Sequence, residues 1–120
     1  MWTYVIAFTD DLSQFMMVRS RKRGGWEMPG GRGIPGETPL QTSQREFLEE
    51  TGHVMISMNE LSTPLGAGIV HFGLIGPGSP SRRSMREILE VSLHSRLPED
   101  LAYPSEEYLP LIELGRRLLS

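Results

Sequence analysis

The stretch GRGIPGETPLQTSQREFLEETG, from Gly31 to Gly52, decides the fold of this chain because it marks both ends of a helix. Thr38 can serve as the N-cap, a proline follows at the first helical position, and Gln41 stands three residues after the cap. Gly52 can take the left-handed conformation that ends many helices. The sequence therefore predicts a helix over residues 39–51.

Three carboxylates, those of Glu46, Glu49 and Glu50, gather on one side of this helix. At 100° per residue they fall within about one 100° sector, where like charges cost stability unless a cation neutralises them. Carboxylate oxygens suit Mg²⁺ or Mn²⁺, and Mg²⁺ also binds substrate phosphates. A solvated, glutamate-rich face is the alternative, and the three residues alone give both interpretations about even weight.

Composition indicates one globular domain. With 120 residues, of which 38% are hydrophobic and 22% charged, we expect a single domain over residues 1–120. The formal net charge of −3 argues against broad nucleic-acid binding, which needs a basic surface. The absence of cysteine excludes disulfides, thiolate metal sites and cysteine nucleophiles.

The sequence shows no export or membrane signal. Met1 leads directly into a short apolar run without a basic segment or a cleavage site. No apolar stretch approaches the roughly 20 residues that a membrane span requires. We therefore expect a cytoplasmic protein without a membrane partner, present as a monomer or a homodimer.

Other elements follow from local patterns of apolar and turn-forming residues. Strands are expected over residues 2–9, 14–19, 26–28, 54–58, 67–75 and 87–94, and a second helix over 106–119. The first two strands form a hairpin, residues 29–31 interrupt regular structure, and residues 76–84 form a loop. Strands with two packed helices indicate the α+β class.

The spacing of the charged residues carries further information. The pattern has fixed residues at Gly31, Glu37, Arg45, Glu46, Glu49, Glu50 and Gly52, with the bulky Phe47 after Glu46. It resembles the signature of the Nudix hydrolase family, in which only the last position departs, because His53 replaces an aliphatic residue. The resemblance implies a Nudix fold: an α/β/α sandwich with a mixed central sheet and a catalytic loop-helix-loop at about residues 31–53.

The resemblance also implies a reaction, the Mg²⁺-dependent hydrolysis of a nucleoside diphosphate linked to another group, with Mn²⁺ able to substitute. Glu49 and Glu50 would be the main metal ligands, and Glu46 a further ligand or the group that accepts the proton of water. The carbonyl of Gly30 would be a backbone ligand. The implied catalytic set also includes Arg45, which would pair with Glu37, while Gly31 and Gly52 serve structural roles.

Residues outside the pattern complete the predicted site. Glu87 is the first candidate for a later metal ligand and Glu90 the second, because strand alternation lets only one of them point inward. Arg19, Arg21 and Arg32 are candidate phosphate-binding residues, since guanidinium groups bind phosphate oxygens in pairs. For each arginine, a solvated surface position is an equally weighted alternative.

The substrate class remains broad at this point. A nucleoside triphosphate or related nucleotide is the first expectation, and ADP-ribose or a dinucleotide is an alternative. A sensor module that keeps the Nudix fold without turnover is the alternative of a different class. The complete set of Arg45, Glu46, Glu49 and Glu50 argues against the sensor, because a module that only binds needs no complete catalytic helix.

Overall fold

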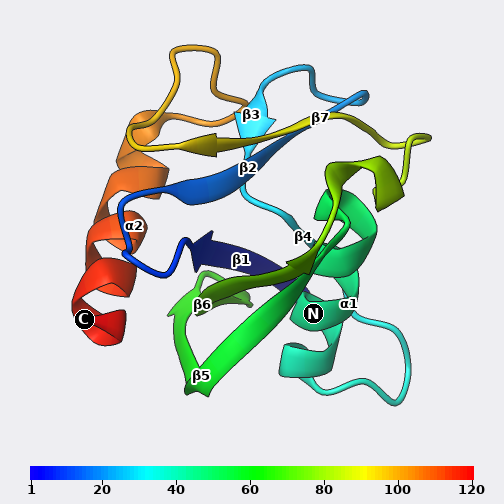
Figure 1. Ribbon diagram of the computed structural model, residues 1–120. Coiled ribbons are helices and arrows are strands. Elements are labelled where there is room, and N and C mark those ends of the chain that lie inside the picture. Colours follow the sequence, from blue (N-terminus) through cyan, green and yellow to red (C-terminus); the bar gives the residue numbers. More distant parts are fainter.

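The computed structural model describes residues 1–120, and its elements follow one another in a β-rich order (Figure 1). The bounds are β1 Trp2–Phe8, β2 Phe15–Ser20, β3 Trp26–Glu27, β4 Gly30–Arg32, α1 Pro39–Thr51, β5 His53–Leu65, β6 Gly68–Gly78, the 3₁₀ turn η1 Pro80–Arg82, β7 Ile88–His94 and α2 Ser105–Leu119. No helix is both long enough and apolar enough to cross a membrane.

The strands form a single mixed sheet of seven strands. Its main path runs β3-β2-β1-β6-β5, with β4 paired to β1 and β7 paired to β2. Strand β1 runs parallel to β6, with Tyr4 opposite Val70, and the other pairings are antiparallel. The antiparallel pairing of β1 with β2 confirms the predicted hairpin.

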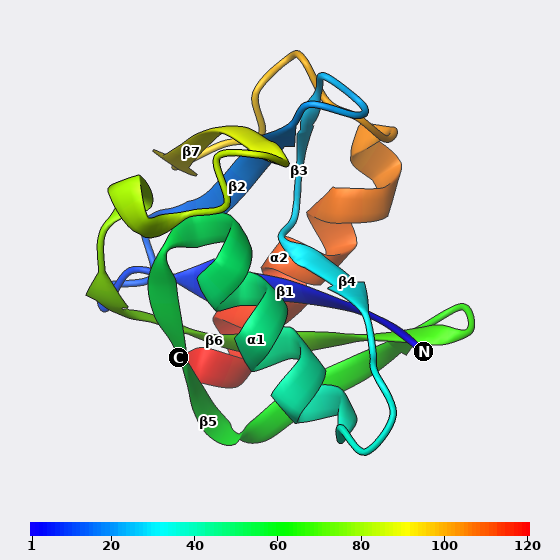
Figure 2. The ribbon, with the colours of Figure 1, turned by 90° about the vertical axis from the view of Figure 1, so that its right-hand side faces the viewer.

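Helices α1 and α2 cover opposite faces of this sheet (Figure 2). Alternate residues of β1 serve the two faces: Ile6 packs in the core on the α2 side, and Val5 packs in the core on the α1 side. Phe47 of α1 and Ile112 of α2 are both buried in their respective cores. This arrangement confirms the predicted α/β/α sandwich with a mixed sheet.

Local signals define the ends of α1 as predicted. The side chain of Thr38 accepts a hydrogen bond from the backbone of Gln41, whose side chain accepts one from the backbone of Thr38. Gly52 has φ 76°, a left-handed conformation that glycine adopts without strain. Inside the helix, Ser43 Oγ lies 2.7 Å from Nδ1 of His71 on β6, which joins the helix to the sheet.

Three predictions of element bounds were wrong. Residues 29–31 do not interrupt regular structure, because Gly30 and Gly31 belong to β4 and pair with β1. Strand β5 continues past residue 58 to Leu65 because it stays paired with β6 across an irregularity between Ser57 and Ser62. Strand β6 likewise runs three residues into the expected loop at 76–84, ending at Gly78.

The second helix matches its predicted range to within one residue at its start. It runs through Pro110, which lacks the N–H for one helical hydrogen bond. Tyr108 and Ile112, on either side of this proline, are buried against the sheet. Tertiary packing therefore carries the helix past a residue that would weaken it in isolation.

Candidate active site

Arg45 links the loop before α1 to the acidic face of the helix. Its guanidinium donates to both carboxylate oxygens of Glu37, with Nε at 2.7 Å and Nη2 at 3.1 Å, and to Glu46 Oε1 at 2.7 Å. It also donates to the carbonyl of Arg32 at 3.0 Å. The hydrogen bonds from Arg45 lower the pKa of Glu37 to about 2. The loop is thereby fixed against the helix by charge-assisted bonds.

Among the carboxylates of α1, Glu50 has the largest pKa shift. Burial raises its pKa to about 8, opposed by the N–H of Gly30, which donates to Oε1 at 2.9 Å. The charges of Glu46, Glu27 and Glu87 push the pKa in the same direction as burial. Glu50 forms no ion pair, so it is a carboxylate that lacks a cation in an acidic environment.

Glu46 lies against the backbone of β4. A Cβ atom placed on Gly31 would be 2.5 Å from Glu46 Cδ, so only glycine leaves room for the carboxylate. Burial raises the pKa of Glu46, Arg45 lowers it through a hydrogen bond, and the charge of Glu49 raises it further. The glycine required by the sequence pattern thus serves the position of a neighbouring carboxylate.

Glu49 is more accessible than the other two, with half of its side chain exposed. Its contact with Arg45 is long, 3.4 Å from Nη1 to Oε2. Its backbone carbonyl accepts a hydrogen bond of 2.6 Å from the N–H of Ser84, in the loop after η1. On the other side of η1, the N–H of Ser79 donates to the carbonyl of Gly52, so the segment around η1 lies over the end of α1.

Of the later carboxylates, the structure brings Glu87 toward α1 and takes Glu90 elsewhere. The charge of Glu87 raises the pKa of both Glu46 and Glu50. Glu90 instead accepts from Arg19 Nη1 at 3.0 Å. Sequence analysis missed Glu27, which also acts on Glu50. The available signal was its position three residues before Gly30, in the run that leads into the motif.

The carboxylates of Glu46 and Glu50 are held by hydrogen bonds to other groups of the protein. No group of three or more histidine, aspartate or glutamate side chains is arranged to hold a metal, because Glu50 is turned to the N–H of Gly30 and Glu46 to Arg45. The donors are nevertheless carboxylates, the hard oxygen ligands that Mg²⁺ and Mn²⁺ prefer. A cation would also remove the electrostatic cost of ionising the buried Glu50. The residues therefore fit a divalent metal by chemistry and charge.

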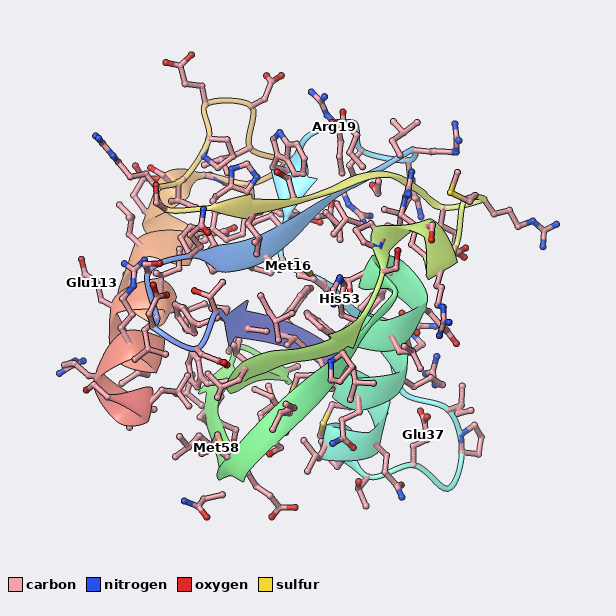
Figure 3. The ribbon with its side chains drawn as sticks, viewed as in Figure 1. Met16, Arg19, Glu37, His53, Met58 and Glu113 are labelled. Carbon is pink, nitrogen blue, oxygen red and sulfur yellow. The ribbon has the colours of Figure 1, made fainter.

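The three predicted phosphate-binding arginines differ in their surroundings. Arg19 is engaged by Glu90 and Asp100, each at 3.0 Å, and lies far from Glu37 and the loop before α1 (Figure 3). Arg21 donates to the carbonyl of Met85 at 3.1 Å, and Arg32 lies 5.2 Å from the ring centroid of Trp2. The geometry therefore disfavours Arg19 as a phosphate ligand and leaves Arg21 and Arg32 without a carboxylate partner.

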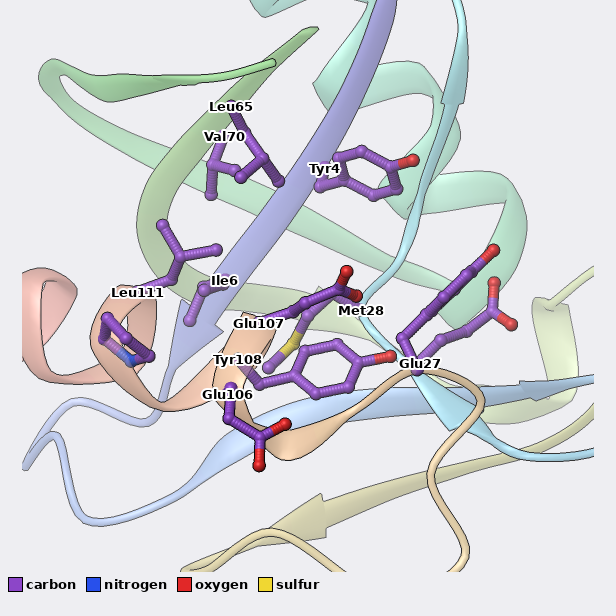
Figure 4. Close-up of a pocket in the computed structure, with 12 residues that line it drawn as sticks. Tyr4, Ile6, Glu27, Met28, Leu65, Val70, Glu106, Glu107, Tyr108 and Leu111 are labelled. Atoms are coloured by element: carbon purple, nitrogen blue, oxygen red, sulfur yellow. The ribbon is translucent and has the colours of Figure 1, made fainter.

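A pocket opens on the α2 side of the sheet (Figure 4). Its volume is about 480 Å³, within the range of small-molecule sites. Its lining combines apolar residues with three tyrosines and three glutamates: Tyr4, Ile6, Glu27, Met28, Leu65, Val70, Tyr103, Glu106, Glu107, Tyr108, Pro110 and Leu111. Trp26 lies outside the lining and is buried in the core. Glu27 belongs to the pocket, and its charge raises the pKa of Glu50. Tyr4, also in the lining, is paired with Gly30, whose N–H donates to Glu50 of the acidic helix.

Comparison with known proteins establishes the family. The family model of the NUDIX domain matches residues 2–114. The chain belongs to the Nudix family. Nudix proteins of known structure share its fold: the Bacillus subtilis pyrophosphohydrolase BsRppH aligns with 98% of this chain and 80% of its own, with a TM-score of 0.69 and 21% identity. An ADP-ribose pyrophosphatase of Streptococcus suis aligns with 96% of this chain and 90% of its own, with a TM-score of 0.67 and 18% identity.

Among curated Nudix relatives, the 8-oxo-dGDP phosphatase NUDT18 of Mus musculus is 29% identical over 125 residues, which cover 95% of this chain and 39% of the mouse protein. A Bacillus subtilis protein provisionally named 8-oxo-dGTP diphosphatase is 38% identical over 50 residues, covering 42% of this chain and 33% of its own length. The chain thus spans less than half the length of the curated relatives that it matches.

Proposed function

We propose that this Nudix domain hydrolyses a diphosphate bond of nucleoside di- or triphosphates with the help of Mg²⁺, and that oxidised purine nucleotides are its preferred substrates. The observation that carries the proposal is the position of Glu50. This carboxylate is partly buried, has other carboxylates around it and forms no ion pair. Glu27, whose charge raises the pKa of Glu50, lines a pocket of nucleoside size. Ionising a carboxylate in such surroundings destabilises the folded protein unless a cation lies beside it.

The residues of α1 would hold the metal and control the protons around it. Glu49 and Glu50 would be the main ligands, with the Gly30 carbonyl and Glu87 as additional candidates. Glu46 would either complete the ligand set or accept the proton of the attacking water. Arg45 and Glu37 would hold Glu46 and the loop before α1 in fixed positions. A bound Mg²⁺ polarises phosphoryl oxygens and lowers the pKa of its water.

The pocket supports a purine base as the other end of the substrate. Its polar lining consists of three carboxylates and three tyrosine hydroxyls, from Glu27, Glu106, Glu107, Tyr4, Tyr103 and Tyr108. Carboxylates accept hydrogen bonds, so the pocket favours a base rich in N–H donors. Oxidation of guanine at C8 adds an N–H at N7 to the donors already on the ring. The names of the mouse and Bacillus relatives refer to 8-oxoguanine nucleotides, which supports the same choice.

A substrate panel tests this proposal. Purified protein with millimolar Mg²⁺ is offered 8-oxo-dGDP, 8-oxo-dGTP, dGTP, ADP-ribose and NADH, and products are separated by ion-exchange chromatography. We expect 8-oxo-dGDP or 8-oxo-dGTP to give the highest kcat/KM, with monophosphate as the nucleoside product. Activity should disappear with EDTA and in Glu50→Gln. If no nucleotide gives a metal-dependent product, the proposed hydrolase activity is wrong. If ADP-ribose or NADH is clearly preferred, the proposed substrate class is wrong.

A further inference from the structure

Arg23 and Glu27 form the tightest ion pair outside the motif. The guanidinium binds both carboxylate oxygens, with Nε to Oε2 and Nη2 to Oε1 each at 2.7 Å. Glu27 lies on β3 and is 8% exposed, whereas Arg23 stands on the loop between β2 and β3 with a side chain that is 40% exposed. The pair therefore joins a buried anion to a cation that solvent can reach.

The position of this pair links the two halves of the site. Glu27 lines the α2-side pocket, and its charge acts on Glu50 of the acidic helix. The charges of Glu50 and of Tyr103, which lines the pocket, both raise the pKa of Arg23. A nucleotide with its base in the pocket and its diphosphate beside α1 would pass along this pair.

We propose that substrate binding exchanges this ion pair: Arg23 leaves Glu27 to bind the diphosphate, and Glu27 then accepts hydrogen bonds from the N–H groups of the base. The inference rests on the proposed function and names the residues that select the substrate within it. Arg23 binds phosphate oxygens with the same two-pronged geometry that it uses on the carboxylate of Glu27. Both side chains are then positioning and specificity residues, not participants in bond cleavage.

The exchange makes recognition of the base and of the diphosphate depend on one another. Removal of Arg23 alone leaves a buried carboxylate without a partner, which is strongly unfavourable. Donors on the base compensate Glu27 only when the base occupies the pocket. A ligand with a diphosphate but without N–H donors therefore leaves Glu27 unpaired, and it is rejected for that reason. The same logic disfavours a free base that lacks a diphosphate.

Two variants test the exchange, compared on two substrates. Arg23→Gln removes the cation, and Glu27→Gln keeps the shape of the carboxylate but removes its charge and one acceptor. The substrates are 8-oxo-dGTP and the triphosphate of purine deoxyriboside, whose base has no N–H donor. Controls are Arg117→Ala and Glu113→Gln, two exposed changes on α2 away from the pocket lining.

We expect Arg23→Gln to raise KM for 8-oxo-dGTP by roughly 30-fold with kcat nearly unchanged, because a charge-assisted contact to phosphate is lost. Arg23→Lys should recover only part of that loss. Glu27→Gln should reduce the preference for 8-oxo-dGTP over the donor-free nucleotide by roughly 100-fold. The control variants should keep the wild-type KM and the wild-type preference.

The exchange would be overturned if folded Arg23→Gln and Glu27→Gln kept both the KM and the base preference of the wild type within about twofold, because the pair would then only fix the loop. Arg23→Lys keeps a cation beside the buried Glu27 but loses the two-pronged contact, so a wild-type KM in this variant would also overturn the exchange even if Arg23→Gln and Glu27→Gln do not fold. If the wild type hydrolyses no nucleotide, the proposed function fails separately. In that case the affinity for non-hydrolysable α,β-methylene-dGDP is measured by calorimetry with the wild type and with Arg23→Gln. The exchange predicts weaker binding to Arg23→Gln, and equal affinities would refute it.

Discussion

The carboxylate of Glu46 occupies the space where a Cβ atom of residue 31 would be, 2.5 Å from Cδ. The glycine of the motif therefore determines the position of a carboxylate fifteen positions later in the chain, on α1. This relationship makes the position of Glu46 testable without changing Glu46 itself.

Gly31→Ala should displace the Glu46 carboxylate and reduce kcat by roughly 100-fold, because small displacements of catalytic groups are costly. The displaced atoms are the end of a flexible side chain, so the melting temperature should change little. Gly33→Ala, directly after β4, is the matched control because its Cβ would meet Thr42 Oγ1 at 3.1 Å and no carboxylate. Equal kcat values for the two variants would show that the position of Glu46 is unimportant.

Glu50→Gln should abolish nearly all Mg²⁺-dependent hydrolysis, a loss of at least roughly 1,000-fold in kcat. The fold should persist, since glutamine can still accept from the N–H of Gly30. Turnover is measured on the best nucleotide of the panel, and circular dichroism reports the fold. A folded variant with wild-type turnover would remove Glu50 from the site.

The metal-free protein should lose stability as pH rises from 6.5 to 8. The folded-state pKa of Glu50, about 8, lies above the 4.5 of an unperturbed glutamate, so its contribution to stability is complete below pH 4.5 and is lost as pH rises through 8. The pKa of Glu37, about 2, affects stability only at lower pH. Burial lowers the pKa values of His71 and His94, so their contributions vary below pH 6.5.

The measurement is urea unfolding with EDTA at several pH values. The free energy of unfolding should fall by on the order of a few kcal/mol across this window in the wild type. The fall should be much smaller in Glu50→Gln, which cannot ionise. Parallel curves for the two proteins would show that Glu50 is not the group responsible.

Divalent metal should reverse this loss of stability. At pH 8, millimolar Mg²⁺ or Mn²⁺ with a non-hydrolysable nucleotide should raise the melting temperature by several degrees, because a ligand of the folded state stabilises it. Calcium-free buffer with EDTA provides the baseline, and Glu50→Gln provides the matched protein control. The same increase in both proteins would place the metal elsewhere.

Arg45→Lys should lower the melting temperature by roughly 5 °C and reduce kcat. A lysine keeps the charge but cannot bond Glu37, Glu46 and the carbonyl of Arg32 together. Differential scanning fluorimetry gives the first quantity and initial rates give the second. Arg117→Lys, an exposed change near the end of α2, should alter neither.

Features with local causes were predictable from sequence. The ends of α1 depend on Thr38, Gln41 and Gly52, all within or beside the helix, and the structure confirms them. Strand β4 was not predictable because Gly30 and Gly31 have little strand preference and are held by pairing with β1. The length of β5 was hidden by Asn59 and Glu60, which adopt positive φ angles of 56° and 52° inside the strand.

The contacts of the candidate site also divide into those between residues close in sequence, which were predictable, and those between distant residues, which were not. The pairing of Arg45 with Glu37 and Glu46 follows from positions close along the chain. The partners of Arg19 lie 71 and 81 residues away, and no local pattern reveals that Glu90 and Asp100 engage it. The α2-side pocket is equally non-local, since it exists only where α2 packs across β1 and β6.

The central strand β1 separates the two halves of the site by the thickness of one backbone. Tyr4 and Ile6 border the pocket, while Val5 and Ala7 support the side that carries Phe47 of α1. Under the proposed function, the rigid strand would set a fixed span between a base in the pocket and a metal ion beside α1. The number of phosphates that a ligand carries would then decide whether it fits, and a longer or shorter span would require rebuilding the sheet itself.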